Sequence, residues 1–246
     1  MNGSAPPYRN RVDAGRVLAG YLAHYEPEEA VVLAIPRGGV PVAVAAAKRL
    51  GTKLDVIVSR KIPIPHNPEA GYGAVTEDGA IVLNEPLVRR LGLTEQLIER
   101  HAAAVRAEIG RRQALYRTYL RPSSVEGKAA IIIDDGLASG YTMVAALKSL
   151  QQRGAARVVA AAPVASSTAR ELVAAVADEV VSPVVSYRYP FAVAAFYRHW
   201  HDLTDAEVFA SLEECAEYGK QQRRGPGGHV LGETGGEPGT VPSVRS

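Results

Sequence analysis

The segment from Ile131 to Met143, which reads IIIDDGLASGYTM, constrains the fold of this chain more than any other part of its sequence. Its three isoleucines suit a buried parallel strand, and Asp134 and Asp135 follow at the carboxyl end of that strand. A loop of small residues comes next, and Thr142 opens an apolar stretch with helical spacing. This order predicts an open α/β sheet, in which ligands bind beyond the carboxyl ends of the strands.

The same segment offers groups that would recognise a sugar phosphate. Small residues leave the backbone uncrowded, so successive N–H groups can converge on an anion. Thr142 adds a hydroxyl at the positive end of the next helix, and the two carboxylates suit vicinal hydroxyls. The loop residues of this predicted phosphate site are Gly136, Leu137, Ala138, Ser139, Gly140, Tyr141 and Thr142. The alternative is an ordinary strand–loop–helix turn with two solvated acids.

Other phosphate-binding motifs do not explain this segment, because it has neither the GK[ST] triplet of a P-loop nor a GxGxxG fingerprint. A second candidate anion loop lies earlier, between a strand predicted over Ala30–Ile35 and a helix predicted over Val40–Leu50 that ends at Gly51. This loop consists of Pro36, Arg37, Gly38 and Gly39. Its two glycines permit close approach of an anion, and Arg37 adds a planar cation with several donors. A tight turn with a surface arginine is the alternative.

Together these motifs resemble those of the type I phosphoribosyltransferases. Ile131–Met143 is similar to their signature for 5-phosphoribosyl-1-pyrophosphate (PRPP), and Pro36–Gly39 is similar to their short pyrophosphate loop. The resemblance covers about Val31 to Val185. It implies an α/β fold with a mostly parallel twisted sheet, helices on both faces and a small C-terminal hood at about 186–215. It also implies a cis peptide bond before a residue other than proline in the pyrophosphate loop.

The resemblance implies transfer of ribose 5-phosphate from PRPP to a nitrogenous acceptor, with release of pyrophosphate, in nucleotide metabolism. It assigns catalytic roles to Asp134, Asp135, Arg37 and Lys61. Mg²⁺ is the implied cofactor, with Asp134 and Asp135 as its ligands, directly or through ribose hydroxyls or water. The remaining implied substrate-binding residues are Pro36, Gly38, Gly39, Arg60, the loop Gly136–Thr142 and Phe191.

The stretch after the strand predicted over Leu54–Val58 begins with Arg60 and Lys61, which suit a polyanionic substrate or plain solvation of the surface. From Arg60 to Gly73 it is rich in proline and glycine and is predicted to be a loop. It occupies the place of the family's mobile catalytic loop, where His66 could carry a proton. A hairpin is predicted over Tyr72–Leu83, because Asp-Gly is a favoured hairpin turn.

The rest of the chain alternates helices and strands, which argues for a parallel sheet covered on both faces. A cap at Thr94 and a capping box of Thr168 and Glu171 mark two helix starts. The further predicted helices are Arg9–Tyr25, Thr94–Leu120, Tyr141–Arg153 and Thr168–Ala177, and the further strands are Arg157–Ala162 and one or two within Glu179–Val185.

Aromatic residues gather between Tyr187 and Trp200, where the family carries its variable acceptor-binding hood. Aromatic faces stack on nucleobases, and Phe191 is the residue expected to do so. A hood core or a dimer seam is an equal alternative. The 6-oxopurine members usually place an acid where this chain has Ala138. The chain therefore looks like the group of predicted phosphoribosyltransferases whose acceptor is unassigned.

A different class of function stays open, because a PRPP- or nucleotide-sensing regulator that binds nucleic acid would carry the same signature. The arginine-rich helix Thr94–Leu120 favours it, although a solvated, ion-paired face explains that helix as well. The formal net charge of +2 argues against a large basic footprint. A nucleoside-phosphate hydrolase has less support, since no nucleophile–base set is visible.

Length and composition set the remaining expectations. The 246 residues suit one domain over 1–218 and a disordered, glycine-rich tail over 219–246. The single cysteine, Cys215, excludes an intrachain disulfide and fits a reducing compartment. No apolar run reaches the roughly 18 residues of a membrane span. We expect a cytoplasmic homodimer that binds PRPP and a base or amine acceptor, without a membrane or nucleic-acid partner.

Overall fold

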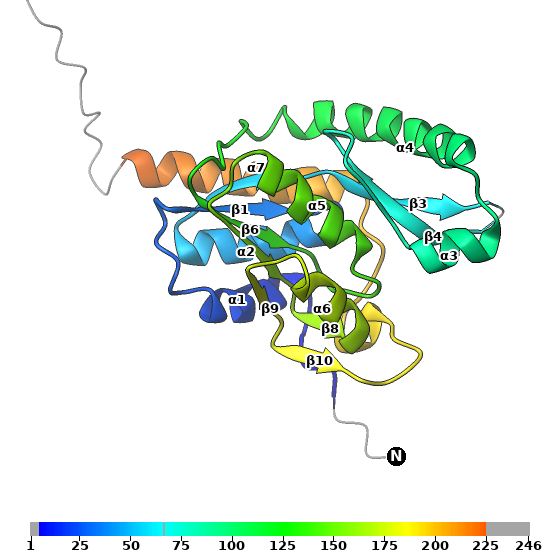
Figure 1. The fold of residues 1–246 in the computed structure, drawn as a ribbon. Coiled ribbons are helices and arrows are strands. Elements are labelled where there is room, and N and C mark those ends of the chain that lie inside the picture. Colours follow the sequence, from blue (N-terminus) through cyan, green and yellow to red (C-terminus); the bar gives the residue numbers. More distant parts are fainter. Residues whose placement is uncertain (1–4, 66, 225–246) are drawn as a thin grey trace, which may run out of the picture.

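A parallel five-stranded sheet forms the centre of the molecule (Figure 1). The computed structural model describes residues 5–65 and 67–224. The strand order is β2-β1-β6-β7-β9, with β1 Ala30–Ala34, β2 Lys53–Val56, β6 Ala129–Ile133, β7 Arg157–Ala161 and β9 Glu179–Val181. Every neighbouring pair in this sheet is parallel. The predicted fold class, a mostly parallel sheet in an α/β protein, is therefore confirmed.

Successive side chains along the strands point to opposite faces of the sheet and pack into two hydrophobic cores, one on each face. Ile131 and Ile133 belong to the core that contains residues of α1, α2, α4 and α7, whereas Ile132 belongs to the core with α5 and α6. This alternation follows from the two-residue period of a strand. The helices that flank the central sheet are α1 Arg11–Tyr21, α2 Gly39–Leu50, α5 Tyr141–Gln152, α6 Ser167–Ala174 and α7 Asp205–Arg224.

A second, antiparallel sheet extends from the central one and lies between α4 and α5 (Figure 1). It contains β3 Ser59–Ile64, β4 Asn67–Thr76 and β5 Ile81–Leu83, and it is followed by α3 Glu85–Leu91 and α4 Glu95–Tyr116. The predicted hairpin between β4 and β5 is confirmed, with Gly79 at φ +88° in its turn. The helix α3 was not predicted from the sequence.

The prediction of a loop from Arg60 to Gly73 is wrong, because most of this stretch forms β3 and β4. Proline is tolerated in β3 because the register shifts at Pro63, where a missing N–H costs no regular ladder bond. Glycine is required in β4, since a Cβ at Gly73 would lie 2.5 Å from the Val82 carbonyl oxygen. Ile62 and Tyr72 are fully buried and hold the two strands in the core. His66 lies outside the described residues.

Local capping signals set most helix ends. Thr94 caps α4 by accepting a hydrogen bond from the Leu97 N–H at 3.3 Å, and Gly51 ends α2 in the left-handed region, so both predictions are confirmed. The capping box at Thr168 is wrong, because α6 starts earlier and Ser166 accepts from the Ala169 N–H at 3.0 Å. Serine and threonine are both favoured N-cap residues, so the residue types alone do not select between Ser166 and Thr168.

The hood is built from both ends of the described chain. The strands β8 Val164–Ser166 and β10 Val184–Ser186 pair in parallel, and the 3₁₀ helix η1 Val193–Phe196 follows. The N-terminal segment joins it, because Tyr8 forms a bridge with Tyr197 and its hydroxyl donates to the Pro163 carbonyl at 2.9 Å. The sequence contained no signal for this N-terminal contribution.

The helix α7 continues to Arg224, so the predicted disordered tail cannot begin at residue 219. Residues 225–246 lie outside the described part of the chain. The start of α7 is a capping box, in which the Thr204 N–H donates to Glu207 at 2.9 Å and the Glu207 N–H donates to the Thr204 hydroxyl at 3.3 Å. Within the described residues, no helix combines the length and the apolar character needed to cross a membrane.

Candidate functional site

The two predicted anion loops meet beyond the carboxyl ends of the neighbouring strands β1 and β6. The Ile35 N–H donates to the Ile133 carbonyl at 2.9 Å and holds the loops together. A Cβ at Gly38 would lie 2.0 Å from Asp135 Oδ2, and one at Gly39 would lie 2.5 Å from the Ile133 carbonyl oxygen. Both glycines are therefore needed for this close packing. The peptide bond from Pro36 to Arg37 is cis, as the family resemblance implied.

The signature loop is fastened to the hood on one side. The Leu137 N–H donates to the Val164 carbonyl at 2.8 Å, and the Ser166 hydroxyl donates to the Ala138 carbonyl at 2.8 Å. Gly140 then takes φ +80° at the start of α5, a conformation that favours glycine. These contacts fix the path of the loop, and Thr142 at the start of α5 lines the same cavity as Pro36 and Arg37 of the pyrophosphate loop.

The backbone amides of the signature loop remain available for an anion. Among the described residues, the N–H groups from Ala138 to Thr142 donate to no other backbone group. They lie at the amino end of α5, where the helix dipole favours negative charge. Ala138 and Ser139 are exposed to solvent. The arrangement suits a phosphate group, as the sequence predicted.

The two acids of the signature have different surroundings. Asp134 is half-buried and lines a cavity, and its Oδ1 accepts a hydrogen bond from the Asp135 N–H at 2.8 Å. Asp135 is turned toward α1, where Arg11 Nε donates to its Oδ2 at 2.8 Å. The Tyr197 hydroxyl donates to the Asp135 carbonyl at 2.6 Å. Only Asp134 therefore faces the space in which a ligand could bind.

Arg11 of α1 contacts the hood as well as the signature acid Asp135. It is 8% exposed, its Nη1 donates to the His201 carbonyl at 3.0 Å, and its guanidinium lies 3.8 Å from the centroid of the Trp200 ring. This residue was not predicted from the sequence, since an arginine in the first turn of a predicted helix looks like a solvated one. Its neighbours Arg9, Asn10 and Asp13 are polar, so the local sequence offered no signal for it.

Burial perturbs the acids and the tyrosine beside them. Burial raises the pKa of Asp134 well above its ordinary range, and the negative charge of Asp135 raises that pKa further. The pKa of Asp135 is also raised by burial, with the Arg11 guanidinium acting in the opposite direction. Burial raises the pKa of Tyr197, so its hydroxyl stays protonated and remains a donor. Perturbed carboxyls beside a cavity are typical of functional sites.

A cavity of about 240 Å³ lies beside Asp134, and four of its lining side chains are cationic. Its charged and hydroxyl-bearing lining includes Arg37, Arg60, Lys61, Arg112, Asp134 and Thr142. Larger hollows of about 600 and 790 Å³ lie elsewhere, and neither contains a residue of the two anion loops. The smaller cavity is the candidate site, because it brings together the loops and the cations that follow the central strands.

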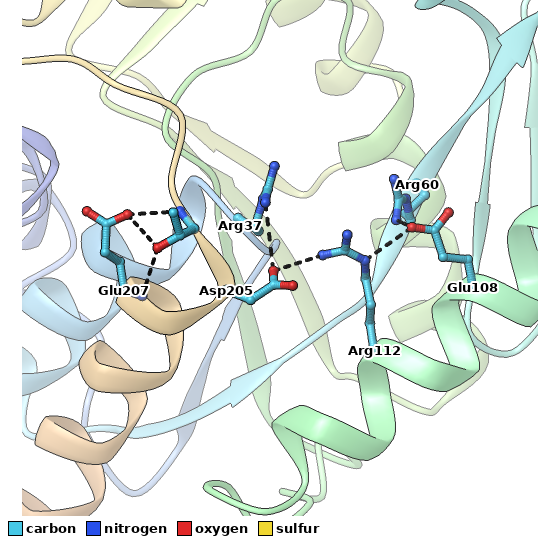
Figure 2. A network of polar contacts seen from close by, with 7 residues as sticks. Arg37, Arg60, Glu108, Arg112, Asp205 and Glu207 are labelled. Atoms are coloured by element: carbon cyan, nitrogen blue, oxygen red, sulfur yellow. Dashed lines mark hydrogen bonds and ion pairs between the residues drawn. The ribbon is translucent and has the colours of Figure 1, made fainter.

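An ion-pair network joins the pyrophosphate loop, β3, α4 and α7 along the rim of this cavity (Figure 2). Asp205 at the start of α7 lies 3.8 Å from Arg37 Nη1 and 3.3 Å from Arg112 Nη1. Arg112 Nε lies 3.3 Å from Glu108 Oε1, and Glu108 also pairs with Arg60. Arg37 and Arg60 were predicted from the sequence. Arg112 and Asp205 were not, because they reach the site through the packing of α4 and α7.

The predicted stacking residue, Phe191, is not among the residues that line this cavity. It is partly exposed, and its ring centroid lies 5.6 Å from that of Phe196. The hood instead approaches the signature loop through Val193, whose side chain would lie 2.6 Å from a Cβ at Gly136. The role of Phe191 toward an acceptor stays a prediction.

The described residues fit a Mg²⁺ that arrives with its substrate. They contain no group of three or more histidine, cysteine, aspartate or glutamate side chains that could hold a metal alone. Mg²⁺ commonly uses one or two carboxylates together with phosphate oxygens and water. Asp134 supplies such a carboxylate at the cavity, whereas Asp135 is already paired with Arg11.

Sequence and structure comparisons agree with this geometry. A family model described as "Phosphoribosyl transferase domain" matches residues 11–195. Two Mycobacterium tuberculosis proteins, named "Putative phosphoribosyl transferase MT0597" and "Putative phosphoribosyl transferase Rv0571c", are each 39% identical over 208 residues, which is 85% of this chain and 47% of those proteins. The crystal structure of TT1426 from Thermus thermophilus is 41% identical, has a TM-score of 0.70 and matches 84% of this chain and 98% of that one.

The chain thus spans about half the length of the curated relatives it matches. The family model nevertheless covers both anion loops and all five strands of the central sheet. Because this family model spans most of the chain and the relatives are 39% identical over 208 residues, the chain belongs to the phosphoribosyl transferase family.

Proposed function

We propose that this protein transfers the 5-phosphoribosyl group of PRPP to a nitrogenous acceptor and releases pyrophosphate. One observation carries the proposal: two anion loops lie side by side at the ends of β1 and β6, and a cationic cavity opens next to one signature acid. PRPP carries a phosphate and a pyrophosphate at opposite ends of a ribose. Its site therefore needs an anion-binding group at each end and a carboxylate for the ribose hydroxyls between them.

Different groups of the site suit the 5-phosphate, the pyrophosphate and the ribose hydroxyls of PRPP. The amides from Ala138 to Thr142 suit the 5-phosphate, because they occupy the amino end of a helix. Arg37, Arg60 and Lys61 suit the pyrophosphate. Asp134 would then face the ribose hydroxyls between them. Mg²⁺, held through Asp134 and substrate oxygens, would neutralise charge on the departing pyrophosphate.

In the proposed reaction, the bond from ribose C1 to a pyrophosphate oxygen breaks, and the electron pair leaves with the pyrophosphate. The lone pair of the acceptor nitrogen forms the new C1–N bond, and a proton lost from that nitrogen passes to solvent. Positive charge develops on the sugar, as in glycoside cleavage. The protein would contribute mainly by positioning the groups and by stabilising the charge on pyrophosphate.

The acceptor is proposed only as a nitrogenous base or amine. Ala138 is exposed in the loop where 6-oxopurine members usually carry an acid, so nothing at this position favours a 6-oxopurine. The aromatic rings of the hood, including Phe191, are the proposed acceptor-binding surface. A homodimer and a cytoplasmic location also stay predictions of the sequence.

The proposal is tested by incubating the purified chain with PRPP, Mg²⁺ and a panel of free bases and small amines, with pyrophosphate release as the measurement. We expect release that depends on one acceptor and is lost when Mg²⁺ is chelated. Absence of PRPP binding by calorimetry would overturn the proposal whatever acceptor is used.

The alternative of a nucleic-acid-binding regulator gains no support from the arginine-rich helix. Arg112 and Arg117 of this region turn inward to pair with Glu108 and with the buried Asp55, and Arg106 pairs with Glu99. These arginines lie in ion pairs within the fold, and the exposed Arg100 and Arg111 alone do not make an extended basic surface for a phosphate backbone.

A further inference from the structure

The arginine at position 112 occupies an unusual place in α4. The residues of this helix that face the core follow a repeat of three and four positions: Ile98, Ala102, Val105, Ile109, Arg112 and Tyr116. All of these except Arg112 pack apolar surface or an aromatic ring against the core, whereas Arg112 opens onto the cavity. A charged residue in an otherwise apolar helix face costs folding free energy unless a partner or a ligand pairs with its charge.

We propose that Arg112 is a pyrophosphate-binding residue of this enzyme, supplied by a helix that lies outside both anion loops. The inference rests on the proposed function and deepens it. Arg112 lines the same cavity as Arg37, Arg60 and Lys61, and its side chain is 25% exposed, so its guanidinium reaches solvent in that cavity.

The contacts of Arg112 leave it able to bind an anion. Nε donates to Glu108 at 3.3 Å, and Nη1 donates to Asp205 at 3.3 Å. The Tyr116 hydroxyl, which lines the same cavity, is a third partner of the guanidinium. A guanidinium has five N–H donors, so these three contacts leave two for a phosphate group. The two carboxylates lie on opposite sides of the guanidinium (Figure 2) and fix its plane. Such a preorganised fork suits the bidentate recognition of phosphate.

The charge balance at the rim also favours an anion. The cavity is lined by four cationic side chains, and the carboxylates of Asp205 and Glu108 each serve two arginines. Sharing two acids among three arginines leaves positive charge uncompensated. A pyrophosphate group carries enough negative charge to complete this balance without breaking any of these four ion pairs.

The experiment compares Arg112→Ala with Arg111→Ala, a matched control on the same helix. Both variants remove one positive charge, but Arg111 is exposed and belongs to no part of the cavity lining. Isothermal titration calorimetry would measure the Kd of inorganic pyrophosphate, of PRPP and of a ribonucleoside 5′-monophosphate, each with Mg²⁺. We expect Arg112→Ala to weaken pyrophosphate and PRPP at least about tenfold, or 1.4 kcal/mol, and to leave the monophosphate within about twofold.

Two further variants complete the test. Arg112→Lys keeps the charge but loses the planar fork, so its loss should be intermediate. Arg112→Gln keeps much of the stem and removes the charge, and it replaces Arg112→Ala if that variant unfolds. Pyrophosphate binding that is unchanged in Arg112→Gln, or an equal loss for the monophosphate, would overturn the assignment while leaving the proposed function intact. Failure of the unaltered protein to bind pyrophosphate or PRPP would overturn both.

Discussion

At the scale of single residues, Asp134 and Asp135 differ in what surrounds their carboxylates. Asp135 has a guanidinium at 2.8 Å, whereas Asp134 is half-buried beside it with a cavity on its open side. An acid held in such a place costs folding free energy when it is ionised, and that cost is characteristic of a group kept for ligand binding. Asp135 instead links the signature to α1 and to the hood.

This difference leads to a prediction for Asp134→Asn. The pKa of Asp134 is raised above the ordinary aspartate value of about 3.9. Between that value and the folded pKa, the native chain binds more protons than the unfolded chain, so the free energy of unfolding falls as pH rises through this window. Above the folded-state pKa, Asp134 is ionised, and the loss of stability from burying its charge reaches its full size. Asp134→Asn should therefore raise the free energy of unfolding at pH 7 by about 1 kcal/mol, or Tm by ~2–4 °C.

The same variant should lose ligand affinity while it gains stability. The asparagine side chain introduced by Asp134→Asn can still accept the hydrogen bond from the Asp135 N–H, so the shape of the loop is kept. PRPP affinity in the presence of Mg²⁺ should fall at least about tenfold by calorimetry. Asp202→Asn, at an exposed carboxyl, serves as control and should change neither quantity. A lower Tm for Asp134→Asn at pH 7 would contradict the prediction.

Arg37 carries a second prediction at this scale. Its side chain is 42% exposed and lies 3.8 Å from Asp205, so it contributes little to the stability of the fold. Arg37→Ala should weaken PRPP and pyrophosphate about tenfold or more and spare a ribonucleoside 5′-monophosphate. The measurement is calorimetry with the three ligands. Equal losses for all three would point to a general disturbance of the loop.

At the scale of elements, the site depends on how closely the two loops pack. The amino end of α2 approaches the signature so closely that a single added carbon at Gly38 would overlap the Asp135 carboxylate. Asp135 has little freedom to move away, because Arg11 and the hood hold it. The pairing of β1 with β6 thus places the pyrophosphate loop directly against the acids.

Gly38→Ala should therefore disturb both the fold and the site. We expect a loss of about 1–3 kcal/mol in the free energy of unfolding, measured by chemical denaturation, together with weaker pyrophosphate binding. Gly110→Ala is the matched control, since a Cβ at Gly110 meets nothing within 4 Å. That glycine lies inside α4, so alanine there should stabilise the protein by roughly 0.5–1 kcal/mol and leave binding unchanged. Equal stability for both variants would argue against the close packing of the loops.

At the scale of the whole molecule, a buried ion pair fastens the end of α4 to the edge of the central sheet. Asp55 of β2 is fully buried, and its carboxylate accepts hydrogen bonds from the Val56 and Ser123 N–H groups at 2.7 and 2.8 Å and from Arg117. Arg117 follows the end of α4. The pair therefore helps to set where α4, and with it Arg112, lies relative to the cavity.

Arg117→Ala should be strongly destabilising, because it leaves a buried carboxylate without its counter-ion. We expect a loss of about 3 kcal/mol in the free energy of unfolding, measured by urea denaturation. Adding Asp55→Asn to Arg117→Ala should recover part of that loss, since the uncompensated charge is then absent. Arg111→Ala again provides the control and should change stability by less than about 0.5 kcal/mol. A double variant less stable than Arg117→Ala would argue against this account.

Features that depend on neighbouring residues could be predicted from the sequence alone. The strand, loop and helix of the signature, the pyrophosphate loop, the cap at Thr94 and the end of α2 at Gly51 follow from apolar patterning, glycine and short polar side chains. The same local reasoning misread the stretch after Arg60, because proline and glycine usually mark loops. In β3 and β4 they instead sit at a register shift and at a close backbone contact, which are tertiary features.

The charged groups that surround the site, by contrast, are set by tertiary packing. Arg11, Arg112 and Asp205 come from α1, α4 and α7, far along the chain from the signature, and nothing in their local sequence points to Asp135 or to the cavity. Their positions follow from how helices pack on the two faces of the sheet, which depends on contacts distant in sequence. For the same reason the two adjacent acids looked equivalent in the sequence, and the packing of α1 made them different.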